Sequence, residues 1–269
     1  MREDGAHGDG RPPAIDADYD AGRTQYYAGD LDGAELSLGK AAGAHPRHVD
    51  ALYLLARTRW KKRDLKGALD AFRSLLSLKP KYASALADLA LLLLEELNDP
   101  EKAERFSRRA IGADPLCAQA FVVLGNALQV RGDTESAVAS YNDALAINPR
   151  LPDAIVNLGV IAHERGDVGS ALGLYDRALE LSPAHPYAHW NRGNALLTLG
   201  RLAEGWKEYE YRFRIRGANA SYRDPDRERA SWDGSPFAGK TLLVYAEQGS
   251  ATRCSLRGSS LSPGSGGGP

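Results

Sequence analysis

Residues 152–185 read PDAIVNLGVIAHERGDVGSALGLYDRALELSPAH, and this stretch decides the fold. Its first half carries apolar residues at helical spacing, namely Ile155, Leu158, Ile161 and Ala162. Its second half carries a similar stripe, namely Ala171, Leu174, Tyr175, Ala178 and Leu179. Gly166 and Asp167, between the two halves, break the helical pattern. Two stripes separated by a turn predict a pair of antiparallel α-helices.

The same pattern returns along the chain at a nearly constant interval. Proline follows an apolar stretch at spacings of 34, 35, 34 and 34 residues, at Pro46, Pro80, Pro115, Pro149 and Pro183. In this register small residues coincide at Gly125, Gly159 and Gly193, and large ones at Phe72, Tyr141, Tyr175 and Tyr209. A single helical hairpin cannot bury its apolar face, whereas stacked hairpins can. The sequence therefore predicts an all-α protein in which similar hairpins stack.

The recurring residues resemble the tetratricopeptide repeat, a 34-residue unit of two antiparallel helices. The resemblance covers residues 15–217 and implies an α-solenoid of about six hairpins. Their expected bounds are 15–48, 49–82, 83–117, 118–151, 152–185 and 186–219. We expect residues 1–14 to be disordered and the first unit to be a frayed cap, because Gly39 and Gly43 weaken its second helix. The extra residue of the third unit is expected in the turn at Asn98 and Asp99.

The composition excludes several classes of protein. Lysine and arginine total 34 against 35 acidic residues, so no nucleic-acid or membrane partner is expected. Only Cys117 and Cys254 could form a disulfide, which favours a reducing compartment. The polar N-terminus does not resemble a secretory signal, and the longest apolar run, residues 89–94, is too short to span a bilayer. We therefore expect a cytoplasmic protein.

The family resemblance implies that the first helix of each pair lines an inner groove. In our register the expected contacts of that groove are Gln119, Val122, Asn126, Gln129, Asp153, Val156, Asn157, Val160, His163, Tyr187, Trp190, Asn191 and Asn194. Asparagine donates and accepts hydrogen bonds, so it can bind the backbone of an extended peptide without reading its sequence. The alternative is a solvated face whose asparagines bond their own backbone. Lysine and arginine are sparse there in units four to six, which argues against a clamp for a carboxylate.

Two further features could carry chemistry but have simpler explanations. His185 and His189 lie four residues apart, a spacing that can hold a metal on a helix, yet Pro186 lies between them and no third ligand is near. We expect no metal and no cofactor. Cys117 begins a helix, which can lower a thiol pKa, but a packed cysteine is the preferred interpretation.

The end of the repeat region changes character. Aromatic residues and arginines alternate over residues 206–216, which could indicate RNA stacking or a capping helix with the aromatics packed inward and the arginines in water. We prefer the cap. Residues 234–241 satisfy the P-loop pattern, but a strand, TLLVY at 241–245, follows where a P-loop needs a helix. No nucleotide site is therefore expected.

Residues 218–249 resemble a linker and the first strand of the glycosyltransferase-like domain of bacterial proteins in which that domain follows tetratricopeptide repeats. Glu247, Gln248 and Gly249 match that family, whereas residues 250–269 look like a low-complexity, disordered tail. A shift of reading frame near Gly249 would explain the change. Without the rest of a sheet, we expect TLLVY to be an isolated strand in a non-globular tail.

The sequence thus predicts a non-catalytic scaffold that binds an extended peptide or protein segment in the groove of units two to six. One alternative is the acceptor-binding part of a protein glycosyltransferase whose catalytic domain is missing here. Another is an assembly module that self-associates through an exposed terminal face.

Overall fold

The computed structural model describes residues 13–215, which are helical almost throughout. The helices of this part are α1 (Pro13–Ala28), α2 (Leu31–Ala44), α3 (Val49–Lys61), α4 (Leu65–Leu78), α5 (Ala83–Glu95), α6 (Pro100–Ala113), α7 (Ala118–Val130), α8 (Thr134–Ile147), α9 (Pro152–Glu164), α10 (Val168–Leu181), α11 (Pro186–Thr198), α12 (Leu202–Tyr209) and a 3₁₀ turn, η1 (Glu210–Arg214). The predicted all-α solenoid is confirmed over these residues. The predicted strand and tail lie outside them. None of the described helices is long and apolar enough to cross a membrane.

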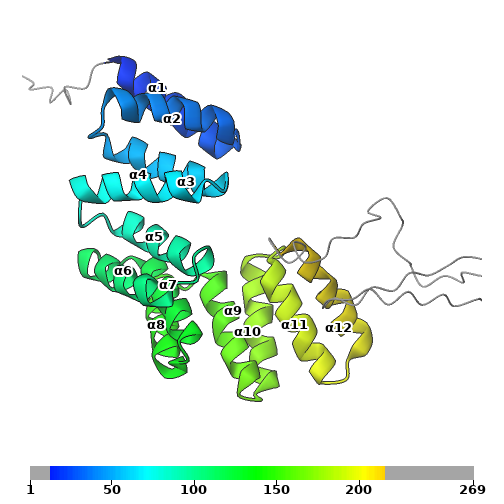
Figure 1. Ribbon diagram of the computed structural model, residues 1–269. Coiled ribbons are helices and arrows are strands. Elements are labelled where there is room, and N and C mark those ends of the chain that lie inside the picture. Colours follow the sequence, from blue (N-terminus) through cyan, green and yellow to red (C-terminus); the bar gives the residue numbers. More distant parts are fainter. Residues whose placement is uncertain (1–12, 216–269) are drawn as a thin grey trace, which may run out of the picture.

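The hairpins stack into a curved array (Figure 1). Each odd-numbered helix pairs with the even-numbered helix that follows it, and the second helix of each pair packs on the next hairpin. Odd-numbered helices also contact one another directly, α1 with α3, α5 with α7, α7 with α9, and α9 with α11. This second set of contacts bends the array, so the odd-numbered helices form its inner face.

A small residue facing a large ring holds each central hairpin together. A Cβ atom built on Gly159 would lie 2.5 Å from Cε1 of Tyr175, and one built on Gly125 would lie 2.4 Å from Cε1 of Tyr141. Both tyrosines are completely buried. Burying one large side chain of this kind stabilises a fold by about 1.5–3 kcal/mol. The glycines of the repeat therefore make room for the rings that fill each hairpin.

The turns inside the hairpins also repeat. An aspartate caps the second helix of five units by accepting a hydrogen bond from the backbone N–H three residues later, at distances of 2.9–3.2 Å for Asp30, Asp64, Asp99, Asp133 and Asp167. The preceding turn needs a left-handed residue, such as Gly166 with a φ of 83°. Arg63 and Asn98 take this conformation in units two and three, with φ of 68° and 49°. Short Asp-capped turns thus set the angle between paired helices.

The first unit is better formed than its glycines suggest. Helix α2 runs for 14 residues, as α4 does, although it contains Gly39 and Gly43. Neither glycine has a neighbour within 4 Å of its virtual Cβ, so each only lowers helix propensity. Tyr26 and Leu38 are buried in one cluster with Leu54 and Leu55 of the second unit. This packing against α3 offsets the weak propensity of α2.

Three glycines of unit five allow one substitution to be tested in three environments. We expect Gly159→Ala to destabilise the protein by about 1–3 kcal/mol, because the new methyl group meets the Tyr175 ring. Gly166→Ala should cost about 1–2 kcal/mol, because φ is positive there. Gly173→Ala, in open space on α10, should stabilise by about 0.5–1 kcal/mol. Urea unfolding followed by circular dichroism measures all three, and equal effects would contradict the packing described.

The aspartate caps predict a loss of stability in acid. Hydrogen bonds from the first turn of the capped helix lower the pKa of Asp99, Asp133 and Asp167 below the ordinary value of 3.8. Their contribution is therefore complete above that value and disappears as the pH falls toward the lowered pKa. We expect wild-type protein to melt at a lower temperature at pH 3 than at pH 6. The triple variant Asp99→Asn, Asp133→Asn, Asp167→Asn keeps the caps without titrating and should lose less over this range. An unchanged pH dependence would show that other carboxyl groups dominate.

Candidate functional site

The inner face contains two adjoining cavities that share four lining residues. One, of about 690 Å³, is lined by residues of α1, α3, α5, α7 and α11. The other, of about 220 Å³, is lined by residues of α5, α7, α9 and α11 and by the cap of α11. The shared residues are Leu91, Glu95, Gln119 and Tyr187. We call the first the upper cavity, the second the middle cavity, and both together the groove.

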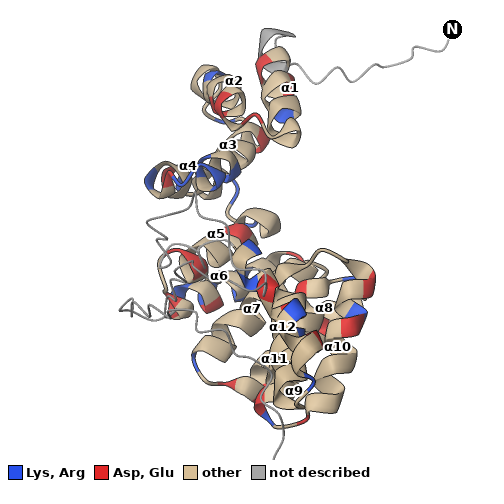
Figure 2. Cartoon of the chain, turned by 90° about the vertical axis from the view of Figure 1, so that its right-hand side faces the viewer, with Lys and Arg blue, Asp and Glu red and all other residues tan. Residues whose placement is uncertain are grey.

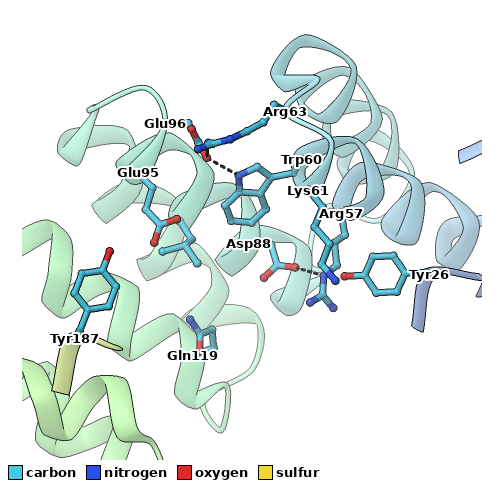
Figure 3. Close-up of a pocket in the computed structure, with 11 residues that line it drawn as sticks. Tyr26, Arg57, Trp60, Lys61, Arg63, Asp88, Glu95, Glu96, Gln119 and Tyr187 are labelled. Carbon is cyan, nitrogen blue, oxygen red and sulfur yellow. Dashed lines mark hydrogen bonds and ion pairs between the residues drawn. The ribbon is translucent and has the colours of Figure 1, made fainter. Parts of the chain in front are cut away.

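Ion pairs between α3 and α5 form one wall of the upper cavity (Figure 3). The Tyr53 hydroxyl donates to Oδ2 of Asp88 at 2.8 Å, and Nε of Arg57 lies 3.5 Å from the same oxygen. Burial raises the pKa of the Asp88 carboxyl, while the Tyr53 hydrogen bond and Arg57 oppose that rise. This half-buried polar group joins the second and third units, and it presents Arg57 to the groove.

A second polar group lies where α3 and α5 end. The indole N–H of Trp60 donates to Oε1 of Glu96 at 3.3 Å, and Arg63 forms an ion pair with the same carboxylate. The Lys61 ammonium lies 4.1 Å from the centre of the Tyr26 ring, a cation–π contact that reaches the first unit. The upper cavity therefore carries both signs of charge, largely in pairs within its wall.

The middle cavity is lined differently, by amides, aliphatic side chains and carboxylates. It has no lysine or arginine among its lining residues. The amide Nδ2 of Asn157 donates to Oδ1 of Asn126 at 2.8 Å, and that oxygen also accepts from the Tyr141 hydroxyl at 2.8 Å. Within the described part of the chain, neither Gln119 nor Asn191 has a side-chain hydrogen bond. Two of the four amides are therefore available to a ligand.

His185 connects α11 to α9 beside the middle cavity. Its Nδ1 accepts a hydrogen bond from the backbone N–H of Ala188 at 3.2 Å, which caps α11. Its Nε2 lies 3.0 Å from Oδ1 of Asp153, in the first turn of α9. This side chain therefore ties the start of α11 to the start of α9.

The structure brings eight of the predicted contact residues together in the middle cavity: Gln119, Val122, Asn126, Asp153, Val156, Asn157, Tyr187 and Asn191. Gln129 instead accepts from the Tyr141 hydroxyl at 3.0 Å, and Nε2 of His163 lies 3.3 Å from Oγ1 of Thr198. Trp190, Asn194 and Val160 line neither cavity. Asn126 uses its oxygen for internal hydrogen bonds with Tyr141 and Asn157.

The sequence-based interpretation missed the upper cavity. Arg57 and Leu91 occupy the position in units two and three that Asn126 occupies in unit four, so the same register could have found them. The register could not have shown that Tyr26 and Tyr187 line the same cavity. They come from the first and last units and meet at one cavity only because the array curves.

The remaining predicted features are placed as follows. His185 and His189 do not share a ligand site, because His185 contacts Asp153 whereas His189 contacts Glu208 and stacks on Tyr211. No group of three or more His, Cys, Asp or Glu residues in the described region could hold a metal. Burial raises the pKa of the Cys117 thiol more than the Ala120 N–H lowers it. The helix start therefore does not activate this cysteine.

The C-terminal cap differs from the expected one. Trp206 is more than half exposed, because it lies on the last helix and no further described hairpin covers it. Arg212 is not in water but lies 3.9 Å from the Phe213 ring centre and 4.5 Å from that of Tyr209. Cation–π contact and an ion pair with Glu210 hold it against the aromatics. The expected arrangement of inward aromatics and solvated arginines is therefore wrong for these two residues.

Comparisons with known proteins agree with this architecture. PilW, described as a widely conserved type IV pilus biogenesis factor, is 21% identical, with 80% of this chain and 97% of that chain covered and a TM-score of 0.65. TTC0263, a thermophilic TPR protein of Thermus thermophilus, is 25% identical over 68% of this chain and 100% of its own, with a TM-score of 0.58. The pilF protein of Pseudomonas aeruginosa is 18% identical over 80% and 98%, with a TM-score of 0.63. These likenesses show a shared fold. The search among curated proteins found no match.

A family model described as tetratricopeptide repeat matches residues 19–83, 88–154, 124–186 and 156–221. These segments together span more than half of the chain and follow the stacked hairpins of the structure. The chain belongs to the tetratricopeptide repeat family.

Proposed function

We propose that this chain is a non-catalytic scaffold that binds an extended peptide or protein segment in the groove. The observation that carries the proposal is the continuity of the two cavities across α3, α5, α7, α9 and α11. A single folded ligand site would be confined to one or two hairpins. A groove that crosses several repeats instead suits a chain whose successive residues meet successive helices.

The chemistry of the groove supports a peptide ligand. The amides that line the middle cavity lie next to the aliphatic residues Val122 and Val156 and the aromatic ring of Tyr187. Amide side chains can pair with both the N–H and the C=O groups of an extended backbone. Aliphatic and aromatic surface then supplies the area that stabilises the complex. Exposed Tyr187 is the candidate anchor for an apolar part of the ligand.

Two other functions are supported by fewer observations. The glycosyltransferase-like resemblance falls on residues outside the described region, and the family match ends at residue 221. Self-association through the terminal face has one supporting observation, the exposure of Leu202 and Trp206 on α12. Variants of groove amides and of Trp206 separate contact in the groove from contact at this end.

The amides of the groove provide the test. Peptides of twelve random residues, displayed on phage, would be selected on the wild-type protein, and the best of them measured by fluorescence anisotropy. We expect Gln119→Ala with Asn191→Ala to weaken binding by about tenfold or more, because two peptide hydrogen bonds of about 1 kcal/mol each are lost. The control Asn142→Ala removes an exposed amide from α8 and should bind normally.

Thermal melting would check that the double variant folds, because both residues lie on helices of the inner face. Full binding by the double variant, together with loss of binding in Trp206→Ala, would move the contact to the terminal face and refute the groove. Failure to select any peptide would refute the proposed function.

A further inference from the structure

A small hydrogen-bonded network on the inner face joins units four and five. The Oδ1 atom of Asn126 accepts from the Tyr141 hydroxyl and from Nδ2 of Asn157, both at 2.8 Å. The same hydroxyl lies 3.0 Å from Oε1 of Gln129. Asn126 belongs to α7 and Asn157 to α9, so a donor of one repeat reaches an acceptor of the repeat before it. Asn126 is therefore the acceptor that two donors from different helices share.

One repeat later the two donors recur without this acceptor. Tyr175 and Asn191 are the counterparts of the donors, but Val160 is the counterpart of Asn126. The Tyr175 hydroxyl is buried and has no hydrogen-bond partner among the described residues. The Asn191 side chain has none in that part of the chain either. Val160 packs against the apolar cluster that contains Tyr175, so an aliphatic side chain fills the place of the acceptor.

The same two positions match in polarity at the neighbouring interfaces. Between units two and three they hold Arg57 and Asp88, with Nε of Arg57 3.5 Å from Oδ2 of Asp88. Between units three and four they hold Leu91 and Val123, which are both apolar. Within units two to six, an amide is matched with an aliphatic side chain only between units five and six. This mismatch leaves the amide of Asn191 unused, although Asn191 lines the middle cavity.

We propose that a backbone peptide group of the bound segment replaces the lost acceptor and pairs with the Asn191 amide beside Val160. This inference rests on the proposed function and names the part of the ligand that Asn191 binds. An asparagine amide both donates and accepts hydrogen bonds, as the peptide group of an extended chain does. The ligand thus completes between units five and six the kind of bond that Asn157 makes with Asn126 between units four and five.

The charges around the cavity favour a peptide group over a ligand carboxylate. No lysine or arginine is among the residues that line the middle cavity. In Figure 2 the basic residues gather near α3 and α4, whereas few lie on α9 and α11. A carboxylate bound to Asn191 would lose water without gaining a basic partner, which is costly, whereas a neutral peptide group loses less. The bond to Asn191 therefore does not depend on the ligand side chain at that point.

The substitution Val160→Asn tests the inference, because it returns the acceptor to the protein and gives Tyr175 and Asn191 an internal partner. Peptides selected from a random library on the full wild-type chain would be measured by fluorescence anisotropy. We expect Val160→Asn to raise the melting temperature by about 2–4 °C and to weaken binding by about fivefold. The control Val160→Ala adds no acceptor, so it should melt at a lower temperature and bind within about twofold of wild type.

The opposite signs separate this effect from a general defect, which would lower stability and binding together. If Val160→Asn acts by engaging Asn191, then Val160→Asn with Asn191→Ala binds no more weakly than Asn191→Ala alone, whereas independent effects would add. A Val160→Asn variant that melts at a lower temperature, binds as tightly as wild type, or adds its loss to that of Asn191→Ala would refute the inference.

Ester substitution in the peptide identifies the group that Asn191 binds. Each peptide bond of a selected peptide would be replaced by an ester in turn, which removes the N–H and weakens the carbonyl acceptor. We expect one position to lose affinity on wild type but not on Asn191→Ala. The absence of such a position would refute the inference, and loss of binding in Gln119→Ala would then show that the groove function still stands. Failure to select any peptide would refute both.

Discussion

The structure depends on the close approach of two helices within each hairpin. In units four and five that approach is possible because glycine stands opposite a tyrosine ring, and a single added methyl group would overlap the ring. The ring in turn fills the space between the helices and is fully buried. Interiors of proteins are packed as densely as organic crystals, so this pair fixes the separation of the helices. The stacking of the hairpins and the inner face that they form depend on this separation.

The groove is a consequence of repetition with small local differences. Odd-numbered helices meet along the inner face in each unit, so equivalent positions form a line across the array. Asn126 and Asn157 occupy different positions of units four and five and bond each other across the inner face, while Gln119 and Asn191 have no side-chain hydrogen bond within the described residues. Arg57 occupies the position of Asn126 in unit two, where it pairs with the half-buried Asp88. One backbone scaffold therefore presents different chemistry at each repeat.

Polar residues in the groove fall into two groups, those that connect neighbouring helices and those that line the cavity. Asp88, Tyr53 and Arg57 connect α3 to α5, and their partial burial makes each dependent on the others. Gln119 and Asn191 instead line the middle cavity without a side-chain hydrogen bond among the described residues. The distinction matters for mutagenesis, because removing a member of the first group leaves a half-buried partner unsatisfied and destabilises the fold. Changes to the second group test the proposed binding with less effect on the fold.

The sequence by itself determined the repeat and the helix pairs, and its resemblance to the tetratricopeptide repeat indicated which helices line the inner face. The spacing of proline, glycine and aromatic residues can be read from neighbouring positions in the sequence. It places residues such as Asn157 and Tyr187 on one side of their helices whatever the arrangement of the repeats in space. Tertiary structure alone decided which of those residues meet. The curvature brings Tyr26 of the first unit and Tyr187 of the sixth to one cavity, and packing turns Asn126 toward Tyr141 rather than toward solvent. The reason is physical: the period specifies directions around each helix, whereas distances between repeats arise from small rotations that accumulate over the whole stack.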